Sequence, residues 1–447
     1  MLATLFTRFP ETARRRLAGC LILCAMLAVV ADLSGLPVSS SVAGVGYWSA
    51  ALLLWPGLSR RNRLQALVLL LVGAVCLAVS ARLGAEMAVT RLLSGNTGLL
   101  SMLVAVSFLS LVSRPGAEQE ESLPRGAGAV ASTLGAVHLF GSVINLSSVF
   151  IIGDRLARRN KVSREQAIVL IRGFTAAAFW SPFFGAMAVS LSVAPDAELS
   201  MLWLMSMPLA LLAMSLTCWQ LWRPSSARQG IAPITDFVGY PLHVGGIGLP
   251  ALLALAVLAW HQLWPGLSIL AVITLLAPVF SLGVLVAGKR SPLAGVGQLT
   301  SDRLPQMGNE LALFLAAGVL AYGLESLLSV WEGSLPLQHF GATAASLTYL
   351  AIVLLSLVGI HPIVCITLAG SVLVPLEPDH TLLALVFLSS WALGTASGPL
   401  SGINLAFQGR YGIDSFSIMR WNLSYLVLMS LCVIAAIWLL ASVLGIG

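Results

Sequence analysis

Charged residues are scarce in this sequence. They make up 9% of its 447 residues, against about a quarter in an average soluble domain, whereas 58% of the residues are hydrophobic. Apolar windows of about 18 or more residues recur from Leu17 to the C-terminal end. A water-soluble globular fold is therefore excluded, and no segment is long and polar enough to form a separate soluble domain.

Cysteine and the common catalytic motifs are also in short supply. The six cysteines lie in apolar stretches without metal-ligand or disulfide spacing and are expected to be small core residues: Cys20, Cys24, Cys76, Cys218, Cys365 and Cys432. The sequence contains no nucleotide-binding glycine loop, no His-Glu-x-x-His helix and no Gly-x-Ser-x-Gly elbow. These absences exclude ATP-driven transport and metalloprotease chemistry, and we predict neither an enzyme nor a bound cofactor or metal.

The positive charge of the chain is concentrated in short loops. The net charge of +6 does not indicate a nucleic-acid partner, because arginines between apolar stretches set the orientation of a membrane protein. Arg14-Arg15-Arg16 precede the first apolar stretch and predict a cytoplasmic N-terminus. We therefore expect a multi-pass protein of a bacterial inner membrane, with lipid as its immediate partner.

The predicted fold class is an all-α polytopic membrane protein with about 11 transmembrane helices plus two re-entrant hairpins in inverted repeats. The predicted spans are 17–35, 43–57, 64–84, 97–113, 166–193, 199–222, 247–262, 267–287, 309–330, 381–408 and 421–446.

Two further apolar stretches, 127–152 and 342–375, are predicted to enter the membrane and return on the same side. Basic residues flank 127–152 at both ends, and its 26 residues are too few for two crossings at about 20 residues each. Its two ends are therefore cytoplasmic. Acidic residues flank 342–375 without a nearby lysine or arginine, so this hairpin should enter from outside. With this threading, only Arg82 and Arg91 of the 24 lysines and arginines lie outside.

The threading predicts two repeats of opposite orientation, an architecture that many secondary transporters share. The predicted divisions are N-terminal scaffold spans in 1–96, a first repeat in 97–222 with the cytoplasmic-side hairpin 127–152, a basic linker with connecting spans in 223–308, and a second repeat in 309–447 with the outer-side hairpin 342–375.

Polar and helix-breaking residues interrupt both repeats at corresponding places. The hairpins contain Phe140-Gly141-Ser142-Val143-Ile144-Asn145-Leu146-Ser147-Ser148 and Val358-Gly359-Ile360-His361-Pro362, and the following spans contain Trp180-Ser181-Pro182-Phe183-Phe184-Gly185 and Gly394-Thr395-Ala396-Ser397-Gly398-Pro399-Leu400-Ser401-Gly402-Ile403-Asn404. The same 217 residues separate Pro182 from Pro399 and Gly185 from Gly402. Proline and glycine leave backbone groups without helical partners, which buried protein, water or a ligand can supply.

We predict that the two hairpin tips and the two breaks surround a substrate near the membrane midplane. Half-helix N-termini suit a carboxylate or oxyanion, whereas freed carbonyls and side-chain oxygens suit Na⁺. The predicted substrate-binding residues are Asn145, Ser147, Ser148, Ser181, Pro182, His361, Pro362, Thr395, Ser397, Ser401 and Asn404, and the predicted cation-binding residues are Ser142, Asn145, Gly185, Gly359, Gly398 and Gly402. The alternative for either break is an ordinary kink between packed helices.

Few titratable residues lie deep enough in the predicted spans to couple protons. The candidates are His361 and Glu325, although His361 can equally be a neutral donor to substrate or bond a backbone carbonyl, and Glu325 lies near the outer face. His138 is expected to be a core histidine with satisfied hydrogen bonds, and Arg172 is expected to snorkel to the cytoplasm. A neutral polar site is therefore favoured over a relay of fixed charges.

These motifs resemble the ion-transporter superfamily, which includes divalent anion/sodium symporters, citrate and arsenite carriers and the membrane subunits of TRAP transporters. Phe140-Gly141-Ser142 with Ser147-Ser148 resembles the first hairpin of TRAP membrane subunits, and Asn145 with Ser147 is similar to the Ser-Asn-Thr tips of the symporters. Asn309-Glu310-Leu311 through Gly323-Leu324 resembles the span before the second hairpin. Neither half has an intact Ser-Asn-Thr tip, and His361-Pro362 stands at the second.

The resemblance implies an elevator-type carrier, often a homodimer, that moves small anions with Na⁺ or H⁺. It also implies a periplasmic binding protein as partner if the chain is TRAP-like. The predicted function is thus secondary active symport of a small organic anion, a carboxylate. The alternatives are export of an inorganic oxyanion or Na⁺/H⁺ antiport by the same architecture, and a membrane-embedded lipid enzyme with His361 or His138 as base, against which the short outer loops argue.

Overall fold

The computed structural model describes residues 10–112, 123–144, 146–158, 161–222, 234–242, 248–264, 266–330 and 339–446. Within these ranges the chain forms helices and connecting segments, and no β-strand. Eight helices in this part of the chain are long and apolar enough to cross a membrane. The predicted fold class, an all-α polytopic membrane protein, is confirmed.

The chain divides into two compact units. Unit 1 comprises Met1–Val112, Leu255–Pro336 and Thr367–Pro375, and unit 2 comprises Ser113–Ala254, Leu337–Ile366 and Leu376–Gly447. Two helices, α12 (Gly248–Leu263) and α17 (Pro362–Leu373), contain residues of both units. The predicted repeats follow a different criterion, the corresponding order of spans and hairpins, and their boundaries stay predictions.

Unit 1 is built from paired helices. Its helices are α2 (Glu11–Leu33), α3 (Ser40–Leu54), α4 (Arg60–Arg82), α5 (Val89–Ser94), α6 (Thr97–Ser107), α13 (Ile269–Ala287), α14 (Pro292–Gln298) and α15 (Gly308–Ser329). The backbones of α4 and α15 lie very close, since a Cβ atom on Gly73 would lie 2.9 Å from the Cα atom of Leu320. Small residues therefore allow these two helices to pack closely, as is common in membrane proteins.

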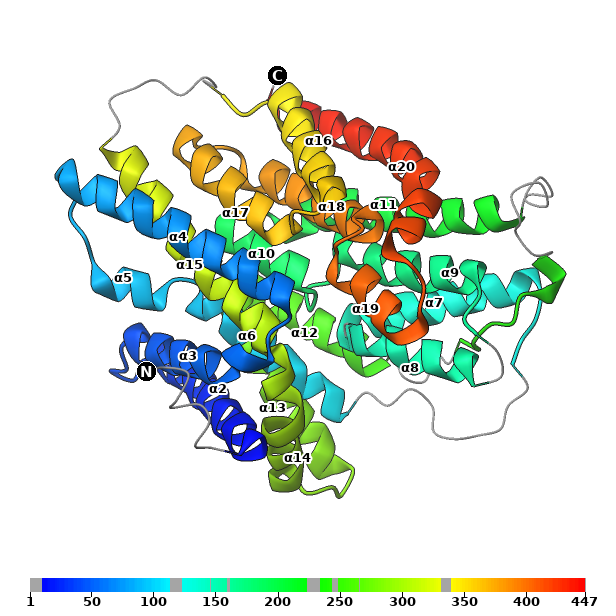
Figure 1. Cartoon of the computed structure of the whole chain (residues 1–447), viewed down its shortest axis with the longest axis horizontal. Coiled ribbons are helices and arrows are strands. Elements are labelled where there is room, and N and C mark those ends of the chain that lie inside the picture. Colours follow the sequence, from blue (N-terminus) through cyan, green and yellow to red (C-terminus); the bar gives the residue numbers. More distant parts are fainter. Residues whose placement is uncertain are drawn as a thin grey trace. The chain divides into compact units, whose positions relative to one another are not determined.

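Unit 2 contains the first predicted hairpin, both predicted helix breaks and the second predicted hairpin up to Ile366. Its helices are α7 (Ala127–Ile144), α8 (Leu146–Ala157), α9 (Arg164–Ala176), the 3₁₀ turn η3 (Ala177–Phe179), α10 (Gly185–Val193), α11 (Leu199–Trp222), α16 (Ala342–Val358), α18 (His380–Ser397), α19 (Gly402–Tyr411) and α20 (Ser415–Val443). The centre of the unit is α18, which is buried from Thr381 to Ser397. Helices α16 and α20 pack against α18, as can be followed in Figure 1.

Local sequence signals fix where the helices of unit 2 begin. A capping box of Ser163 and Gln166 starts α9. The Asp379 carboxylate accepts from the backbone N–H of Leu382 at 2.9 Å and starts α18. Side chains of Ser401 and Asp414 cap α19 and α20 in the same way. The helix after each of these caps is thus positioned by its own first residues.

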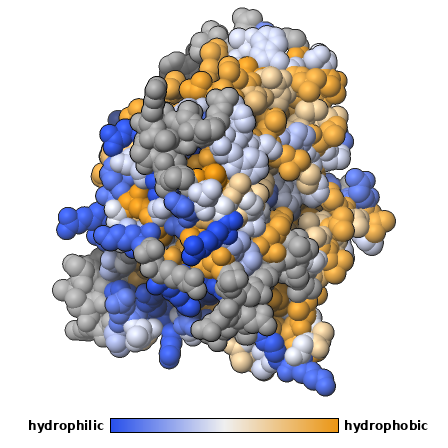
Figure 2. All heavy atoms as spheres, turned by 90° about the vertical axis from the view of Figure 1, so that its right-hand side faces the viewer, coloured by the Kyte–Doolittle hydropathy of each residue, from blue (hydrophilic) through white to orange (hydrophobic). Residues whose placement is uncertain are grey.

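The outer faces of the unit 2 helices are apolar. Leu204 and Leu211 of α11 are each 64% exposed, and Val427 and Leu431 of α20 are exposed to a similar degree. Figure 2 shows hydrophobic side chains at the surface beside a region where hydrophilic side chains gather. Such faces match a lipid environment, in which apolar side chains need no burial in protein.

The helices end and begin again where the sequence predicts hairpin tips and breaks. The stretch 127–152 forms α7 and α8, and 342–375 forms α16, α17 and a 3₁₀ turn, Val374–Leu376. The predicted span 166–193 is divided between α9 with η3 and α10, and 381–408 is divided between α18 and α19. Both helices are thus interrupted at the predicted breaks, and the role of the breaks in binding a ligand stays a prediction.

Candidate functional site

The first break is fastened to the first hairpin. After η3 the chain leaves the helix at Trp180 and resumes it at Gly185, with Pro182 buried between them. The Ser181 hydroxyl donates to the carbonyl of Ser142 at 2.5 Å and accepts from the N–H of Phe183 at 3.2 Å. One side chain thus joins the end of α7 to the break and satisfies backbone groups of both.

His138 stabilises the same break from α7. Its Nδ1–H donates to the carbonyl of Gly173 at 3.1 Å, and its Nε2 accepts from the indole N–H of Trp180 at 3.0 Å. The Trp180 carbonyl accepts in turn from the indole N–H of Trp203 at 2.9 Å. Both ring nitrogens are used, which fixes the neutral tautomer with its proton on Nδ1. His138 is therefore a core histidine, as expected.

The second break has its own hydrogen-bond network. The chain leaves α18 at Gly398, and the Ser401 hydroxyl caps α19 by accepting from the N–H of Asn404 at 3.4 Å. The Asn404 side-chain amide donates to the carbonyls of Ala396 at 3.3 Å and Gly398 at 2.9 Å. The Asn422 amide, from α20, donates to the same Ala396 carbonyl at 2.9 Å. Side-chain amides thus take the place of the missing helical donors.

Several side-chain oxygens at this break have no hydrogen-bond partner within the described part of the chain. Among the residues that the structure describes, no hydrogen bond reaches Thr395 Oγ1, Ser397 Oγ or Asn404 Oδ1, although all three atoms are buried. Ser389 Oγ, two turns earlier on α18, is in the same position. Buried polar atoms without partners are costly, so each calls for a ligand or an ordered water.

The second hairpin packs backbone to backbone against the second break. Gly359, at a φ of 107°, ends α16, and a Cβ atom there would lie 2.3 Å from Cδ1 of Leu400. A Cβ atom on Gly398 would lie 2.8 Å from the carbonyl oxygen of Ser356, and one on Gly394 would lie 2.7 Å from the Ser356 hydroxyl. A Cβ atom at Gly398 would require the Ser356 backbone to shift, and one at Gly359 or Gly394 would require the Leu400 or Ser356 side chain to move.

His361 lies at the tip of the second hairpin. Its Nδ1 accepts from the N–H of Ile363 at 3.2 Å, and its ring meets the Trp391 ring edge-on at a centroid distance of 5.6 Å. The proton of the neutral imidazole is therefore on Nε2. Within the described ranges, no hydrogen bond engages Nε2, which makes it an available donor.

The two breaks belong to one group of helices, because α9, η3 and α10 all contact α18. The N–H of Glu198, in the loop after α10, also donates to the Thr381 hydroxyl of α18 at 3.0 Å. Each hairpin tip thus meets the break that follows it, and the two interrupted helices pack against each other.

The remaining predicted site residues take varied positions. Gly185 and Gly402 begin the helices after the two breaks, and Pro362 begins α17. Ser142 and Ser148 are buried in the first hairpin, where the Ser142 hydroxyl donates to the carbonyl of Leu139 at 2.8 Å. Asn145 and the side chain of Ser147 lie outside the described residues.

Glu325 takes part in an ion pair of unit 1. Its carboxylate is 2.8 Å from the guanidinium of Arg91, and both side chains are more than half exposed. All other predicted site residues belong to unit 2. No described residues form a cluster of three or more His, Cys, Asp or Glu side chains that could hold a metal ion.

The prediction that Arg172 snorkels to the cytoplasm is wrong. Its side chain is 2% exposed and donates to Asn422 Oδ1 at 2.7 Å, Gln220 Oε1 at 2.7 Å and the Trp421 carbonyl at 3.1 Å. Its guanidinium also lies 4.3 Å from the ring centroid of Tyr425. Amide oxygens of α11 and α20 replace water around the charge, so the side chain turns inward. The sequence offered one signal for this arrangement, the isolated polar residues Gln220 and Asn422 in two apolar helices. No local pattern links these residues to Arg172.

Comparisons with known proteins give limited information. No protein-family model matches the sequence, and no curated protein matches it. Among solved structures, the chain is similar to a crystal structure of the YdaH transporter of Alcanivorax borkumensis, which is described as having an unusual topology. The two are 15% identical with a TM-score of 0.48, and the alignment covers 85% of this chain and 98% of that chain.

Proposed function

We propose that this chain is a secondary active transporter that carries a small organic anion, a carboxylate, across the bacterial inner membrane by symport with Na⁺ or H⁺. The observation that carries the proposal is a pair of interrupted, buried helices in contact, each with a hairpin tip against its interruption. In a membrane, interrupted backbone is tolerated only inside protein or along a cavity. Ion-coupled carriers place substrate and ion at such interruptions and move them by alternating access, here of the elevator type.

The second break is suited to the coupling ion. Thr395, Ser397 and Asn404 supply three buried neutral oxygens that have no partner in the described part of the chain. The backbone carbonyls of Ala396 and Gly398 are at the same break, where both accept from the Asn404 side-chain nitrogen. Neutral oxygens in a water-poor site suit Na⁺, a hard cation that side chains and carbonyls can dehydrate without a carboxylate. H⁺ would instead require a titratable group, for which His361 is the candidate in unit 2.

Positive groups in unit 2 favour an anion as the substrate. His361 presents an Nε2–H that has no hydrogen-bond partner among the described residues, and the N-termini of α10 and α19 carry partial positive charge. The Arg172 guanidinium is buried among neutral acceptors, and no described carboxylate lies within ion-pair distance of it. A carboxylate substrate can accept from the Nε2–H of His361 and from the two helix N-termini, whereas Arg172, whose nitrogens already donate to protein acceptors, contributes only its positive charge.

The enzyme alternative loses one of its two candidate bases. His138 already uses both ring nitrogens within the fold, so it has no lone pair for substrate. A homodimer and a periplasmic binding protein remain predictions that follow from the resemblance to the ion-transporter superfamily.

A ligand screen with a matched pair of variants tests the proposal. Purified protein is heated with small carboxylates and oxyanions, each in Na⁺ or K⁺, because a ligand that binds the folded state raises its melting temperature. We expect one carboxylate to stabilise the wild type in a Na⁺-dependent way. Thr395→Val removes an unpartnered hydroxyl and should raise the midpoint for Na⁺ about tenfold or more, which corresponds to about 1.4 kcal/mol.

The matched control is Ser390→Ala on the same helix. Ser390 is buried like Thr395, with an exposed fraction of 0% against 9%, but its hydroxyl already donates to the carbonyl of Val386 at 2.7 Å. This variant should keep the Na⁺ midpoint of the wild type. Stabilisation by Na⁺ alone or by pH alone, with no response to any anion, would overturn the anion-carrier proposal in favour of cation exchange.

A further inference from the structure

Arg172 lies on the helix that leads into the first break, yet its contacts extend toward the second. It belongs to α9, which continues through η3 to Trp180, while its partner Asn422 belongs to α20. Asn422 in turn bonds the Ala396 carbonyl at the end of α18. Three helices from both halves of the sequence thus meet in one hydrogen-bond chain.

The orientation of the Asn422 amide in this chain is determined by its neighbours. The guanidinium of Arg172 can only donate, so the atom 2.7 Å from its Nε must be the amide oxygen of Asn422. The amide nitrogen is then the atom that faces Ala396, and a carbonyl can only accept. Reversal of the amide would put a donor against a donor and an acceptor against an acceptor.

Asn404 is oriented by the same logic. Its amide nitrogen donates to the carbonyls of Ala396 and Gly398, so its Oδ1 must point away from them. The Asn422 amide donates to the same Ala396 carbonyl and helps to hold it in place. As a result, the buried Oδ1 of Asn404 has no partner among the described residues. The side chains of Asn422 and Arg172 fix its position indirectly.

We propose that Arg172 is a positioning residue of the second break: it orients Asn422, and Asn422 and Ala396 hold Asn404 so that its Oδ1 serves as a fixed ligand of the coupling cation. This inference rests on the proposed function. Charge-assisted hydrogen bonds are shorter and stronger than neutral ones, which explains why an arginine rather than a neutral donor occupies this position. Residues that orient the ligands of a bound ion typically change its affinity 10–100-fold when removed, by analogy with metal sites.

A double substitution separates positioning from simple stabilisation. Arg172→Met alone strands the amide oxygens of Asn422 and Gln220 and should lower the melting temperature. Arg172→Met with Asn422→Leu replaces both members of the Arg172–Asn422 pair by apolar groups of similar size, which restores part of the stability, although Gln220 Oε1 and the Trp421 carbonyl still lack the donor that Arg172 supplied. If Arg172 only stabilises the fold, the double variant regains Na⁺ affinity as well; if it positions Asn404, the affinity stays low.

Na⁺ titration gives the first measurement. Melting temperatures are recorded from low to high NaCl, with choline chloride holding the ionic strength constant. We expect the midpoint for Na⁺ in the double variant to rise at least about tenfold above that of the wild type. Gln220→Met is the matched control, because it removes another acceptor of Arg172 that does not lead to Asn404; its midpoint should not change.

Hydrogen exchange gives a second measurement that needs no ligand. Exchange of backbone amides in 394–404 should be faster in the double variant and unchanged in Gln220→Met. Unchanged exchange in the double variant overturns the inference, whether or not Na⁺ binds. If the wild type does not respond to Na⁺ but exchange still rises, the role of Na⁺ fails while the positioning of the break by Arg172 stands.

Discussion

At the scale of single residues, the two histidines of the hairpins illustrate how hydrogen-bond partners decide chemistry. His138 and His361 each lie in a hairpin and each contact a tryptophan of the following broken helix. His138 is used at both nitrogens, whereas His361 is used only at Nδ1. His138 therefore stabilises the first hairpin and its break through both ring nitrogens, whereas His361 keeps one N–H donor at the second hairpin tip.

This difference predicts that two substitutions of His361 affect carboxylate binding differently. His361→Gln places an amide N–H near the position of Nε2 and should keep most of the affinity for a carboxylate. His361→Asn places an amide oxygen near the position of Nδ1, where it can still cap the N–H of Ile363, but it loses the outer donor. We expect His361→Asn to keep the melting temperature and weaken carboxylate binding about tenfold, measured by thermal shift with the carboxylate that stabilises the wild type most. Equal affinities in the two variants would show that Nε2 does not contact the substrate.

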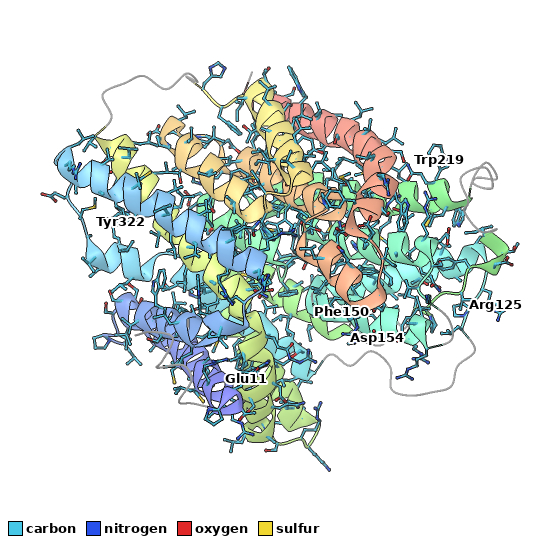
Figure 3. All side chains as sticks on the ribbon, in the orientation of Figure 1. Glu11, Arg125, Phe150, Asp154, Trp219 and Tyr322 are labelled. Atoms are coloured by element: carbon cyan, nitrogen blue, oxygen red, sulfur yellow. The ribbon has the colours of Figure 1, made fainter. Side chains whose placement is uncertain are left out.

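At the scale of helices, α8 is attached to α19 by a small polar cluster. The guanidinium of Arg410 donates from Nε to Asp154 Oδ1 at 2.7 Å and from a second nitrogen to Asp154 Oδ2, and the Tyr411 hydroxyl donates to Oδ1 at 3.0 Å. Phe150 lies beneath Arg410, and Gly153 leaves room for the Tyr411 hydroxyl. Figure 3 shows Phe150 and Asp154 next to each other on α8. The second arm of the first hairpin is thus fixed to the second broken helix.

The cluster predicts a defined pH dependence of stability. The hydrogen bonds from Arg410 hold the pKa of Asp154 below its ordinary value of 3.8. Because the folded state lowers this pKa, the stabilisation is complete above about pH 5 and is lost as the pH falls through the folded-state pKa. Asp154→Asn should lower stability by at most about 1 kcal/mol, since the pair is half exposed, and equally from pH 8 to about 5.

Denaturation midpoints of the wild type and the variant from pH 8 down to about pH 3 check the prediction. A combined Asp154→Asn, Arg410→Gln variant should lose little more than either single variant, because both remove the same interaction. A difference between wild type and Asp154→Asn that grows below pH 4 would contradict the assigned direction of the pKa shift.

The contribution of sequence reasoning differs between elements and contacts. Both helix breaks were predictable, because Pro182, Pro399 and their neighbouring glycines act locally on the backbone that contains them. The inward turn of Arg172 was not, because it depends on Asn422 and Gln220, which are distant in sequence. The lack of partners at Thr395, Ser397 and Asn404 also appears only when every neighbour is known. Periodicity and helix breakers report local structure, whereas burial and hydrogen-bond partners arise from packing.

At the scale of the whole molecule, residues that contact each other in unit 2 are predicted to lie on the same side of the membrane. Asp154 and Arg410 form an ion pair, and the threading puts both on the cytoplasmic side. Asp196 and His380 are 3.2 Å apart, and the threading puts both outside. Pairs of residues far apart in sequence thus meet on one predicted side, whereas a single misplaced span between the two members of a pair would put them on opposite sides.

Cysteine labelling tests this orientation. In a variant without the six native cysteines, Lys161→Cys lies in the exposed loop before α9 and Pro195→Cys in the exposed loop after α10. We expect a membrane-impermeant maleimide to label Pro195→Cys in intact cells and Lys161→Cys only after permeabilisation, because basic loops stay in the cytoplasm. Labelling of Lys161→Cys alone in intact cells would show that the orientation in the membrane is the reverse of the predicted one. The two hairpins would then enter from the opposite sides. Labelling of both from one side would mean that α9 and α10 together do not cross the membrane. The first break would then not lie between two aqueous compartments, and alternating access at the paired breaks would have no basis.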